Sequence, residues 1–381
     1  MPHGGIRFMS KSTLILGTMS GTSCDGLDVA LLEVSASDEG CTLLAFRSVD
    51  YPEDWRSRLS RLALLPETDL PVIEAEWTRW VSEQIQEIRS EWDEHHGVPA
   101  LLGFSGHTLY HEPRGRGTKA IGDAAWLSDA LGMPVVAEYR NADVAAGGQG
   151  APLVPMFDAC VFGREYRCCI NLGGIANLTL LPPASAEVVA WDVVGCNLLL
   201  NRQAARLGMP MDRDGASAAK GSVDEKVLER MERWPFLHRS APKSLAAEDL
   251  VGIHAQLDSV PDAQDALATG AEWVARALGD AVSQGTKPGR IMLTGGGALN
   301  SHLVKRIGQH LPSGWMASIP ERQWVEGKEA AAFAWLAWRT ARGQTTSLAS
   351  VTGAERDVCG GRLFGNFAMS GNDRDACKKS S

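Results

Sequence analysis

The sequence predicts an α/β fold built from two lobes. Apolar segments of strand length alternate with segments of helical periodicity along most of the chain, which is typical of an α/β protein. A strand, a glycine-centred turn and a second strand occur at Leu14–Val34 and again at Tyr166–Leu181, so one design occurs twice. The length of 381 residues exceeds what one compact core usually holds, which favours two lobes.

The first half continues from the opening hairpin with strands and helices in turn. Residues 72–92 place Ile and Trp side chains at helical spacing. Residues 100–113 read as a strand and a loop, and residues 120–140 as a helix that leads into a strand. Residues 141–162 contain a flexible glycine-rich centre followed by two prolines, which suits a connection between lobes.

The second half repeats this alternation. Residues 188–208 read as a buried strand, a turn and a helix, and residues 222–234 and 268–282 as amphipathic helices. Residues 290–311 read as a strand, a triple glycine and a helix, and an alanine-rich helix follows at 327–343. We expect lobe I to span 14–165 with 325–366 and lobe II 166–324, and we expect a disordered extension at 1–13 and a disordered tail at 367–381.

The composition is that of an ordinary globular protein, with 44% hydrophobic and 22% charged residues. A net charge of -9 argues against nucleic acid as a partner. The eight cysteines include no CxxC pair, a usage typical of reduced thiols, and no apolar run reaches the length of a membrane span. We therefore expect a cytoplasmic protein without a membrane segment.

The glycine turns are candidate phosphate sites. Glycine lets the backbone approach a ligand closely, and such turns aim amides at anions, although the opening turn is also compatible with an ordinary hairpin. The GxxxxGK[ST] motif is absent, and Asn300 stands where a dinucleotide fingerprint requires glycine. One turn from each half could hold a polyphosphate between them: the opening loop, and either Gly173–Gly174 or Gly195. The triple glycine at Gly295 suits a phosphate at a helix N-terminus or tight strand–helix packing.

Asp192 is the candidate general base. A carboxylate at the end of a buried strand is costly without partners or a task, and proton transfer is the usual task. A capping or metal-organising role is the alternative, and Asn197 could likewise be a cap or a ligand. His107 and His111 lie in an extended segment without the HExxH arrangement, which argues against zinc.

Six segments in a fixed order resemble one known family. These are "GTMSGTSCDGLDVALLEV", "DVAAGGQGAPLVP", "NLGGIANLT", "PKS", "LTGGGALN" and "EAAAFAWLA". Together they resemble the anhydro-N-acetylmuramic acid kinases from about Leu14 to Thr352, and the second segment is the most specific. The resemblance implies the two-lobed actin/hexokinase-like fold, with ribonuclease H-like duplicated domains and a nucleotide cleft between the lobes.

The resemblance also implies a double reaction in peptidoglycan recycling. Water opens the 1,6-ether of 1,6-anhydro-N-acetylmuramic acid, and the freed oxygen takes the γ-phosphoryl group of ATP, giving MurNAc 6-phosphate and ADP. ATP and Mg²⁺ are the implied cofactors, the anhydrosugar is the implied small-molecule partner, and a homodimer is the implied assembly.

The family's site residues map onto this sequence as expectations. Asp192 matches the catalytic aspartate, and Asp25 and Asp192 are expected to hold the metal through water. The substrate-binding positions are His107, Arg140, Asp143 and Glu329. The ATP-binding positions are Gly21, Thr22, Ser23, Cys24, Asp25, Gly26, Leu27, Asp28, Gly173, Gly174, Gly195, Asn197, Gly295, Gly296, Gly297 and Asn300.

Three segments depart from the family pattern. "DVVGCN" stands for Asp-x-Gly-Pro-Gly-Asn, so Val193 and Val194 alter the turn after the base. "FSGHT" stands for Ser-His-Gly-Gln-Thr, which places Ser105 and His107 at its histidine and glutamine. "LAAE" replaces Thr-Gly-Arg-Glu, with Ala247 at the arginine. Two alternatives stay open: a kinase for another 1,6-anhydrosugar such as levoglucosan, and a nucleotide- or sugar-binding regulator with impaired catalysis.

Overall fold

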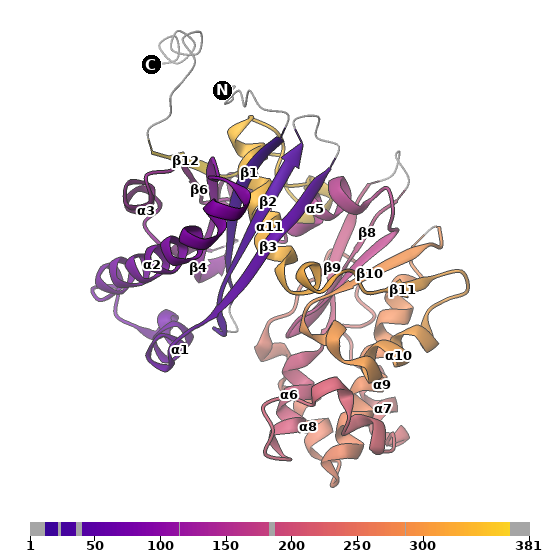
Figure 1. Cartoon of the computed structure of the whole chain (residues 1–381). Helices are drawn as coiled ribbons and strands as arrows, with labels where there is room; N and C mark the ends of the chain where they lie inside the picture. The colour runs from indigo at the N-terminus through magenta and orange to yellow at the C-terminus, as the bar shows by residue number, and fades with distance from the viewer. Residues whose placement is uncertain are drawn as a thin grey trace. The chain divides into compact units, whose positions relative to one another are not determined.

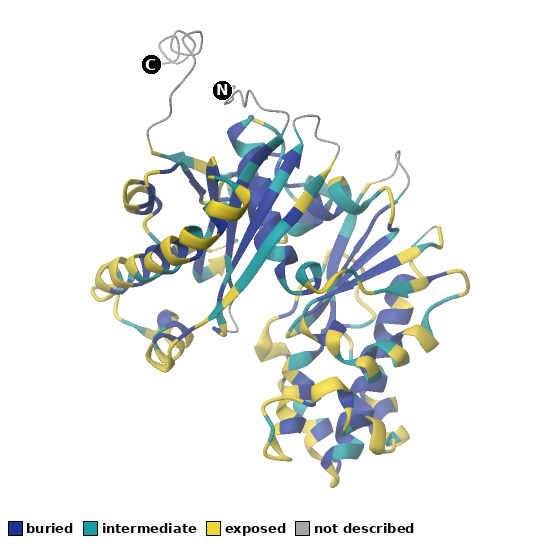
Figure 2. Ribbon diagram, in the orientation of Figure 1, coloured by how far each residue is buried: buried dark blue, intermediate teal, exposed yellow. Residues whose placement is uncertain are grey.

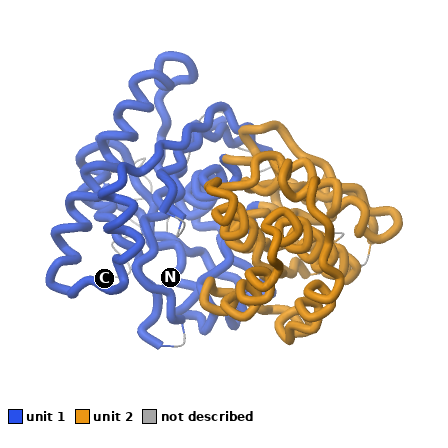
Figure 3. The backbone as a smooth tube through the Cα atoms, turned by 90° about the horizontal axis from the view of Figure 1, so that it is seen from below, with its two compact units in different colours: residues 1–157, 327–381 blue, residues 158–326 orange. Residues whose placement is uncertain are grey.

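The computed structural model describes residues 12–21, 24–35, 40–113, 115–182, 187–285 and 287–365 (Figure 1). The chain forms two compact units (Figure 3). Unit 1 comprises residues 1–157 and 327–381, and unit 2 comprises residues 158–326. The predicted extension and tail lie outside the described residues, except for Ser12 and Thr13, which open the first strand.

Unit 1 is built on a sheet of strand order β12-β6-β4-β1-β2-β3, with β5 paired to β4. β1, β2 and β3 are antiparallel neighbours, whereas β4 runs parallel to β1 and β6 runs parallel to β4. The strands are β1 (Ser12–Ser20), β2 (Gly26–Ser35), β3 (Cys41–Asp50), β4 (Leu101–Glu112), β5 (Gly117–Ile121), β6 (Val135–Ala137) and β12 (Arg362–Phe364).

Helix α2 (Leu70–His96) covers one face of this sheet. Its buried side chains recur every three or four residues from Ile73 to Trp92, as predicted, and Gly97 ends it with a φ of 100°. Trp77 stacks on Phe104 of β4 with ring centroids 5.9 Å apart. Shorter α-helices of unit 1 are α1 (Glu53–Ser60), α3 (Ala124–Leu131), α4 (Asn141–Ala145), α5 (Val154–Phe157) and α12 (Ala349–Thr352).

Helix α11 (Arg322–Ala341) lies on the opposite face of the unit 1 sheet. Gly17 and Gly103 are paired across β1 and β4, and both face this helix. A Cβ on Gly17 would lie 2.0 Å from the carbonyl oxygen of Ala330, and one on Gly103 would lie 2.1 Å from that of Phe333. Gly17 is therefore a strand residue that lets a helix approach, not part of the opening loop, which is confined to residues 21–25.

Unit 2 is built on a sheet of strand order β11-β10-β7-β8-β9. Helix α9 (Ala263–Val282) is buried along most of its length and packs against β9, α6 and α10 (Figure 2). The strands are β7 (Cys168–Leu172), β8 (Ile175–Leu180), β9 (Val189–Gly195), β10 (Arg290–Thr294) and β11 (Met316–Ser318). The other α-helices are α6 (Asn197–Ala205), α7 (Glu225–Glu232), α8 (Val251–Asp258) and α10 (Ser301–His310).

The two sheets repeat one topology. β7, β8 and β9 are antiparallel neighbours like β1, β2 and β3, β10 runs parallel to β7 as β4 does to β1, and β11 runs parallel to β10 as β6 does to β4. The predicted α/β class and the predicted duplication are confirmed by this shared strand order. The sequence analysis missed β5, which is short and has only one buried residue.

The close approach of α11 to the sheet makes a testable prediction. Gly103→Ala places a methyl group on the main-chain oxygen of Phe333, and such overpacking costs about 1–3 kcal/mol. We expect a lower midpoint in denaturant and a lower Tm. Gly40→Ala is the control, because nothing lies within 4 Å of its added Cβ. Equal midpoints for the two variants would contradict the packing described here.

Candidate active site

Two glycine turns of unit 2 lie against each other around Asn197. Its backbone amide donates to the carbonyl of Gly173 (3.1 Å), and its side-chain amide donates to the carbonyl of Leu172 (2.9 Å). On the other turn, a Cβ on Gly297 would lie 2.8 Å from Cβ of Leu172 and 3.2 Å from Oδ1 of Asn197. The turn after β7 and the turn after β10 therefore meet only because Gly297 has no side chain.

Four backbone amides at these turns, those of Gly173, Gly174, Gly296 and Gly297, have no hydrogen-bond acceptor in the described part of the chain, and of their residues Gly297 is buried. Gly296 and Gly297 begin the 3₁₀-helix η6 (Gly296–Leu299), where the first amides have no partner inside the helix. Gly174 and Gly296 are exposed, so a ligand can reach them. We call these four glycines and Asn197 the glycine cradle. Such free amides fit the phosphate groups of a nucleotide.

Two other predicted nucleotide residues in unit 2 have structural contacts. A Cβ on Gly195 would lie 2.8 Å from a side-chain carbon of Leu250, so this glycine makes room for the core. Asn300 caps α10, because its side chain accepts a hydrogen bond from the amide of Leu303 (2.9 Å). The amide of Ser301 donates to Asp214 (3.0 Å). Protein groups therefore occupy part of the N-terminus of α10, and the free amides lie before it, in η6.

Asp192 lies within β9 and not at a strand end as predicted. The strand continues to Gly195 because Val193 and Val194 are buried in the core of unit 2. The side chain of Asp192 is half-buried, and its Oδ2 accepts a hydrogen bond from the amide of Leu245 (2.9 Å). Burial raises the pKa of Asp192, and the Leu245 hydrogen bond lowers it by a smaller amount. A carboxylate with a raised pKa suits a general base.

The orientation of Asp192 follows from strand alternation. Trp191 and Val193, its neighbours in β9, line a cavity of about 450 Å³ beside α9. Because side chains alternate along a strand, Asp192 lies on the opposite face of the sheet, where Asn177 of β8 is its cross-strand neighbour. That cavity is therefore not the site of the candidate base.

The described residues of the predicted phosphate loop of unit 1 include several that are packed against the protein interior. Cys24 is buried with a φ of 55°, and its amide donates to the carbonyl of Gly21 (3.1 Å). A Cβ on Gly26 would lie 2.5 Å from the carbonyl oxygen of Val49, and Leu27 belongs to the core. Asp25 is exposed and Asp28 half-buried, whereas Thr22 and Ser23 lie outside the described residues.

His107 lies in the interior of unit 1 with 2% of its surface exposed. Its Nδ1 is 2.8 Å from Oγ of Ser20, which is 2.7 Å from the hydroxyl of Tyr51. Its Nε2 is 4.0 Å from Sγ of Cys24. Burial lowers the pKa of His107 to about 4, so the imidazole is neutral at neutral pH. Its contacts tie the opening turn to β4, and its role as a sugar ligand stays a prediction.

The other three predicted sugar residues also belong to unit 1. Asp143 is fully buried and accepts hydrogen bonds from the hydroxyls of Ser347 (2.8 Å) and Thr352 (2.7 Å) and from the amide of Gly150 (2.7 Å). These bonds fix the glycine-rich 147–150 segment, which the sequence analysis expected to be flexible. Arg140 and Glu329 are half-buried; burial lowers the pKa of Arg140, and the Glu329 carboxylate raises it by a smaller amount.

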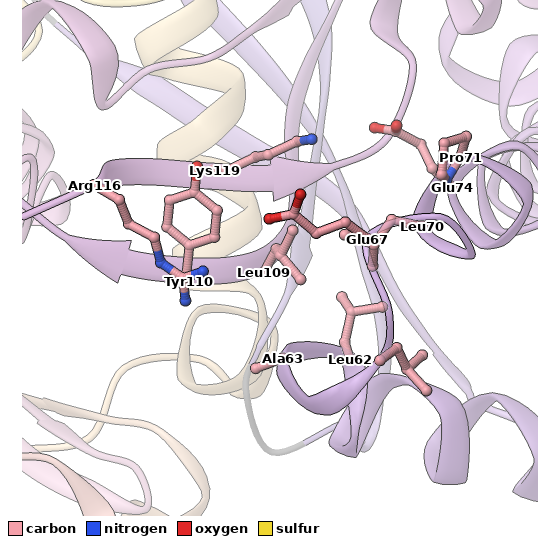
Figure 4. Close-up of a pocket in the computed structure, with 11 residues that line it drawn as sticks. Leu62, Ala63, Glu67, Leu70, Pro71, Glu74, Leu109, Tyr110, Arg116 and Lys119 are labelled. Carbon is pink, nitrogen blue, oxygen red and sulfur yellow. The ribbon is translucent and has the colours of Figure 1, made fainter.

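Two cavities of unit 1 lie beside the β4–β5 hairpin. The one in Figure 4, about 240 Å³, has an apolar wall from residues 62–71 and Leu109 and carries the charged side chains of Glu67, Arg116 and Lys119. The other, about 210 Å³, is lined by Arg140 and by Ser105 and Gly106 of the departed "FSGHT" segment. Arg140 is the one predicted site residue among the lining residues of either cavity.

The described residues show neither a cluster of metal ligands nor a membrane-spanning helix. No three His, Cys, Asp or Glu side chains gather there in a way that could hold a metal ion. Over the same residues, no helix combines the length and the apolarity that a bilayer crossing needs.

The sequence analysis missed the residues that hold Asp192. Lys243 and Leu245 contact this aspartate through their backbones. Lys243 belongs to the "PKS" segment, and Leu245 directly follows it. That segment was noticed only as part of the resemblance. Backbone contacts leave no residue-type signature, so no pattern in the sequence could have assigned this role.

The family model described as "Anhydro-N-acetylmuramic acid kinase" matches residues 13–366, which places the chain among the sugar kinases. Relatives of that name include proteins of Thiobacillus denitrificans, 36% identical over 92% of this chain and 95% of the relative, and of Pseudomonas putida, 37% identical over 90% and 96%. The chain belongs to the anhydro-N-acetylmuramic acid kinase family.

Solved structures align with the chain at lower similarity. The activator of the 2-hydroxyisocaproyl-CoA dehydratase from Clostridium difficile with bound ADPNP aligns with a TM-score of 0.46 at 12% identity, over 86% of this chain and 96% of that one. A glucokinase from an Antarctic psychrotroph aligns with a TM-score of 0.34 at 11% identity, over 86% and 99%.

The buried imidazole of His107 makes stability depend on pH. In the unfolded chain a histidine binds a proton below its ordinary pKa of 6.5, whereas folded His107 binds one only below about 4. The contribution of this neutral imidazole to the free energy of unfolding is therefore complete above pH 6.5 and is lost as the pH falls towards 4. About 2 kcal/mol of it is lost between pH 7 and pH 5. His107→Gln should remove this part of the pH dependence in denaturant titrations. His96→Gln, at an exposed position, should keep it. If the free energy of unfolding of His107→Gln depended on pH as strongly as that of wild type, the assignment of this pH dependence to His107 would be refuted.

Proposed function

We propose that this protein is an ATP-dependent kinase that opens 1,6-anhydro-N-acetylmuramic acid with water and phosphorylates its O6. The products are MurNAc 6-phosphate and ADP, which places the enzyme in the recycling of peptidoglycan. Family membership over residues 13–366 supports the substrate, and the glycine cradle, with its four free amides, is the observation of the structure that supports ATP binding.

Asp192 and the glycine cradle have separate roles in the proposed reaction. Asp192 takes the proton from water as the water oxygen attacks the anomeric carbon of the sugar. The bond between that carbon and the bridging oxygen breaks, and the oxygen, now O6, takes the γ-phosphoryl group while ADP leaves. The cradle amides bind and orient the phosphates, and such fixed donors stabilise charge without reorganising during the reaction.

The remaining parts of the proposal rest on the family resemblance. Mg²⁺, which supplies charge neutralisation on the phosphates, would be held through water by Asp25 and Asp192. Arg140, Asp143, Glu329 and His107 would form or support the sugar pocket. Of these, Arg140 has the best geometry for direct contact, because it lines a cavity of about 210 Å³. We further propose that the protein is a cytoplasmic homodimer.

The first test of the proposal is Asp192→Asn. Loss of a general base usually lowers the rate about 10²–10⁴-fold, and we expect kcat for ADP release with the anhydrosugar to fall by such a factor. Only the ionised carboxylate accepts a proton, and burial raises its pKa. As the pH is lowered, the wild-type rate should therefore begin to fall at a higher pH than the ordinary pKa of an aspartate would give. This acid limb should be absent in the variant. Retention of most of the rate would exclude Asp192 as the base.

A substrate panel distinguishes the open alternatives. Purified protein is incubated with ATP and Mg²⁺ and either 1,6-anhydro-N-acetylmuramic acid or levoglucosan, and ADP and sugar phosphate are measured. Faster turnover of levoglucosan would favour the alternative kinase, and tight binding of ATP and sugar without product would favour a regulator.

The cradle gives a separate test of nucleotide binding. Gly296→Val puts a side chain beside the free amides, and the nearest atom to its Cβ, Nδ2 of Asn197, is 3.7 Å away, which is ordinary van der Waals contact. Loss of one charge-assisted hydrogen bond costs about 1.5–3 kcal/mol, so we expect the Kd for ATP to rise at least about tenfold. Gly308→Val, in α10 with open space around its Cβ, is the control. Unchanged ATP affinity in titration calorimetry would exclude the cradle as the phosphate site.

A further inference from the structure

One loop of unit 2 makes two hydrogen bonds with the candidate base, one with its backbone amide and one with its carboxylate. The amide of Asp192 donates to the backbone carbonyl of Lys243 (3.1 Å), and the amide of Leu245 donates to the Asp192 carboxylate (2.9 Å). The orientation and the hydrogen bonding of the carboxylate are therefore set by where residues 243–245 lie. We call residues 236–245 the base loop.

The position of the base loop depends on one ammonium group. Nζ of Lys243 donates to the carbonyls of Phe236 and Leu237, each at 3.0 Å, and lies 4.7 Å from the centre of the Phe236 ring. The lysine side chain thus closes the loop upon itself, joining its end to its beginning. Hydrogen bonds from a charged donor are roughly twice as strong as neutral ones.

Nothing else in the described chain fixes this part of the loop by hydrogen bonds. From Ser240 to Leu245, the hydrogen bonds are those made by the Lys243 ammonium and those made with Asp192. Ser240, Ala241, Pro242 and Ser244 are exposed, so packing holds them little. Leu245 is buried and anchors the far end. Without the ammonium, residues 240–244 would be held to β9 only by the hydrogen bond from the Asp192 amide to the Lys243 carbonyl and by the neighbouring Leu245.

We propose that Lys243 is a positioning residue for Asp192, acting through the base loop and not by contact with the substrate. The proposal rests on the proposed function, because it assumes that Asp192 accepts the proton from water. A displacement of about 1 Å at a reacting group can cost about 10²-fold in rate. Loss of the ammonium should therefore lower kcat and leave substrate affinity almost unchanged.

The kinetic test compares variants of two lysines. Lys243→Met removes the donor and keeps an unbranched side chain one atom shorter, Lys243→Gln replaces the ammonium with a neutral amide and serves if the first fails to fold, and Lys243→Arg restores charged donors. We expect kcat about 10- to 100-fold lower for the first two, KM within about twofold, and most of the rate restored with Arg. Lys226→Met, at an exposed position in α7, should behave as wild type. A change confined to KM would overturn the proposal.

A double-mutant cycle separates positioning from general destabilisation. If Lys243 acts through Asp192, its loss should matter little once the carboxylate is gone, so Lys243→Met should change the residual rate of Asp192→Asn less than about twofold. The same 10- to 100-fold loss in both backgrounds would show that Lys243 acts independently of Asp192 and would overturn the proposal.

An activity-free measurement keeps this inference separate from the proposed function. In protein labelled with ¹⁵N-leucine, the amide of Leu245 should be protected from hydrogen exchange in wild type, Lys243→Arg and Lys226→Met. The Leu245 amide should exchange faster in Lys243→Met. It should also exchange faster in Asp192→Asn, because a neutral amide oxygen replaces the carboxylate as the acceptor. Continued protection in Lys243→Met would overturn the positioning role whether or not the sugar is turned over. Absence of turnover by wild type, with the predicted exchange pattern, would refute the proposed function alone.

Discussion

Each unit depends on a close contact between two stretches of main chain. Such a contact is possible only where a glycine, which has no side chain, stands at the point of approach. In unit 1, Gly17 and Gly103 let α11 lie on the sheet with its carbonyls where side chains would otherwise be. In unit 2, Gly295 and Gly297 let the turn after β10 lie against Leu172. The first contact builds a core, whereas the second leaves free amides beside an exposed surface. The same steric condition thus supports packing in one unit and the proposed phosphate binding in the other.

The duplicated topology gives the two units equivalent turns with different uses. The β1–β2 turn of unit 1 and the β7–β8 turn of unit 2 occupy the same position in the strand order. In unit 1 the described part of the turn buries the side chain of Cys24 beside His107. In unit 2 the turn consists of Gly173 and Gly174, and only backbone is available for contact. A phosphate-binding role is therefore better supported for the second turn, although the sequence drew attention to the first.

The sequence was sufficient where the signal is local. The apolar spacing from Ile73 to Trp92 predicted α2, and the repeated strand–glycine–strand pattern predicted the duplication. It was insufficient where the structure depends on distant partners. Leu245 is 53 residues from Asp192, and Ser347 is 204 residues from Asp143, so neither hydrogen bond follows from periodicity or turn composition. For the same reason the sequence suggested a flexible 147–150 segment, whereas buried carboxylate bonds fix it.

The order of the segments along the chain also determines when each unit can fold during synthesis. Unit 2 is one continuous stretch and is complete once residue 326 has been translated, whereas unit 1 needs the final segment. Until then the strand faces at Gly17 and Gly103 lack the helix that covers them, and β6 lacks its partner β12. Since domains generally fold as units during synthesis, we expect the second lobe to fold first and the apolar face of the earlier-made sheet to stay uncovered until the final segment is translated.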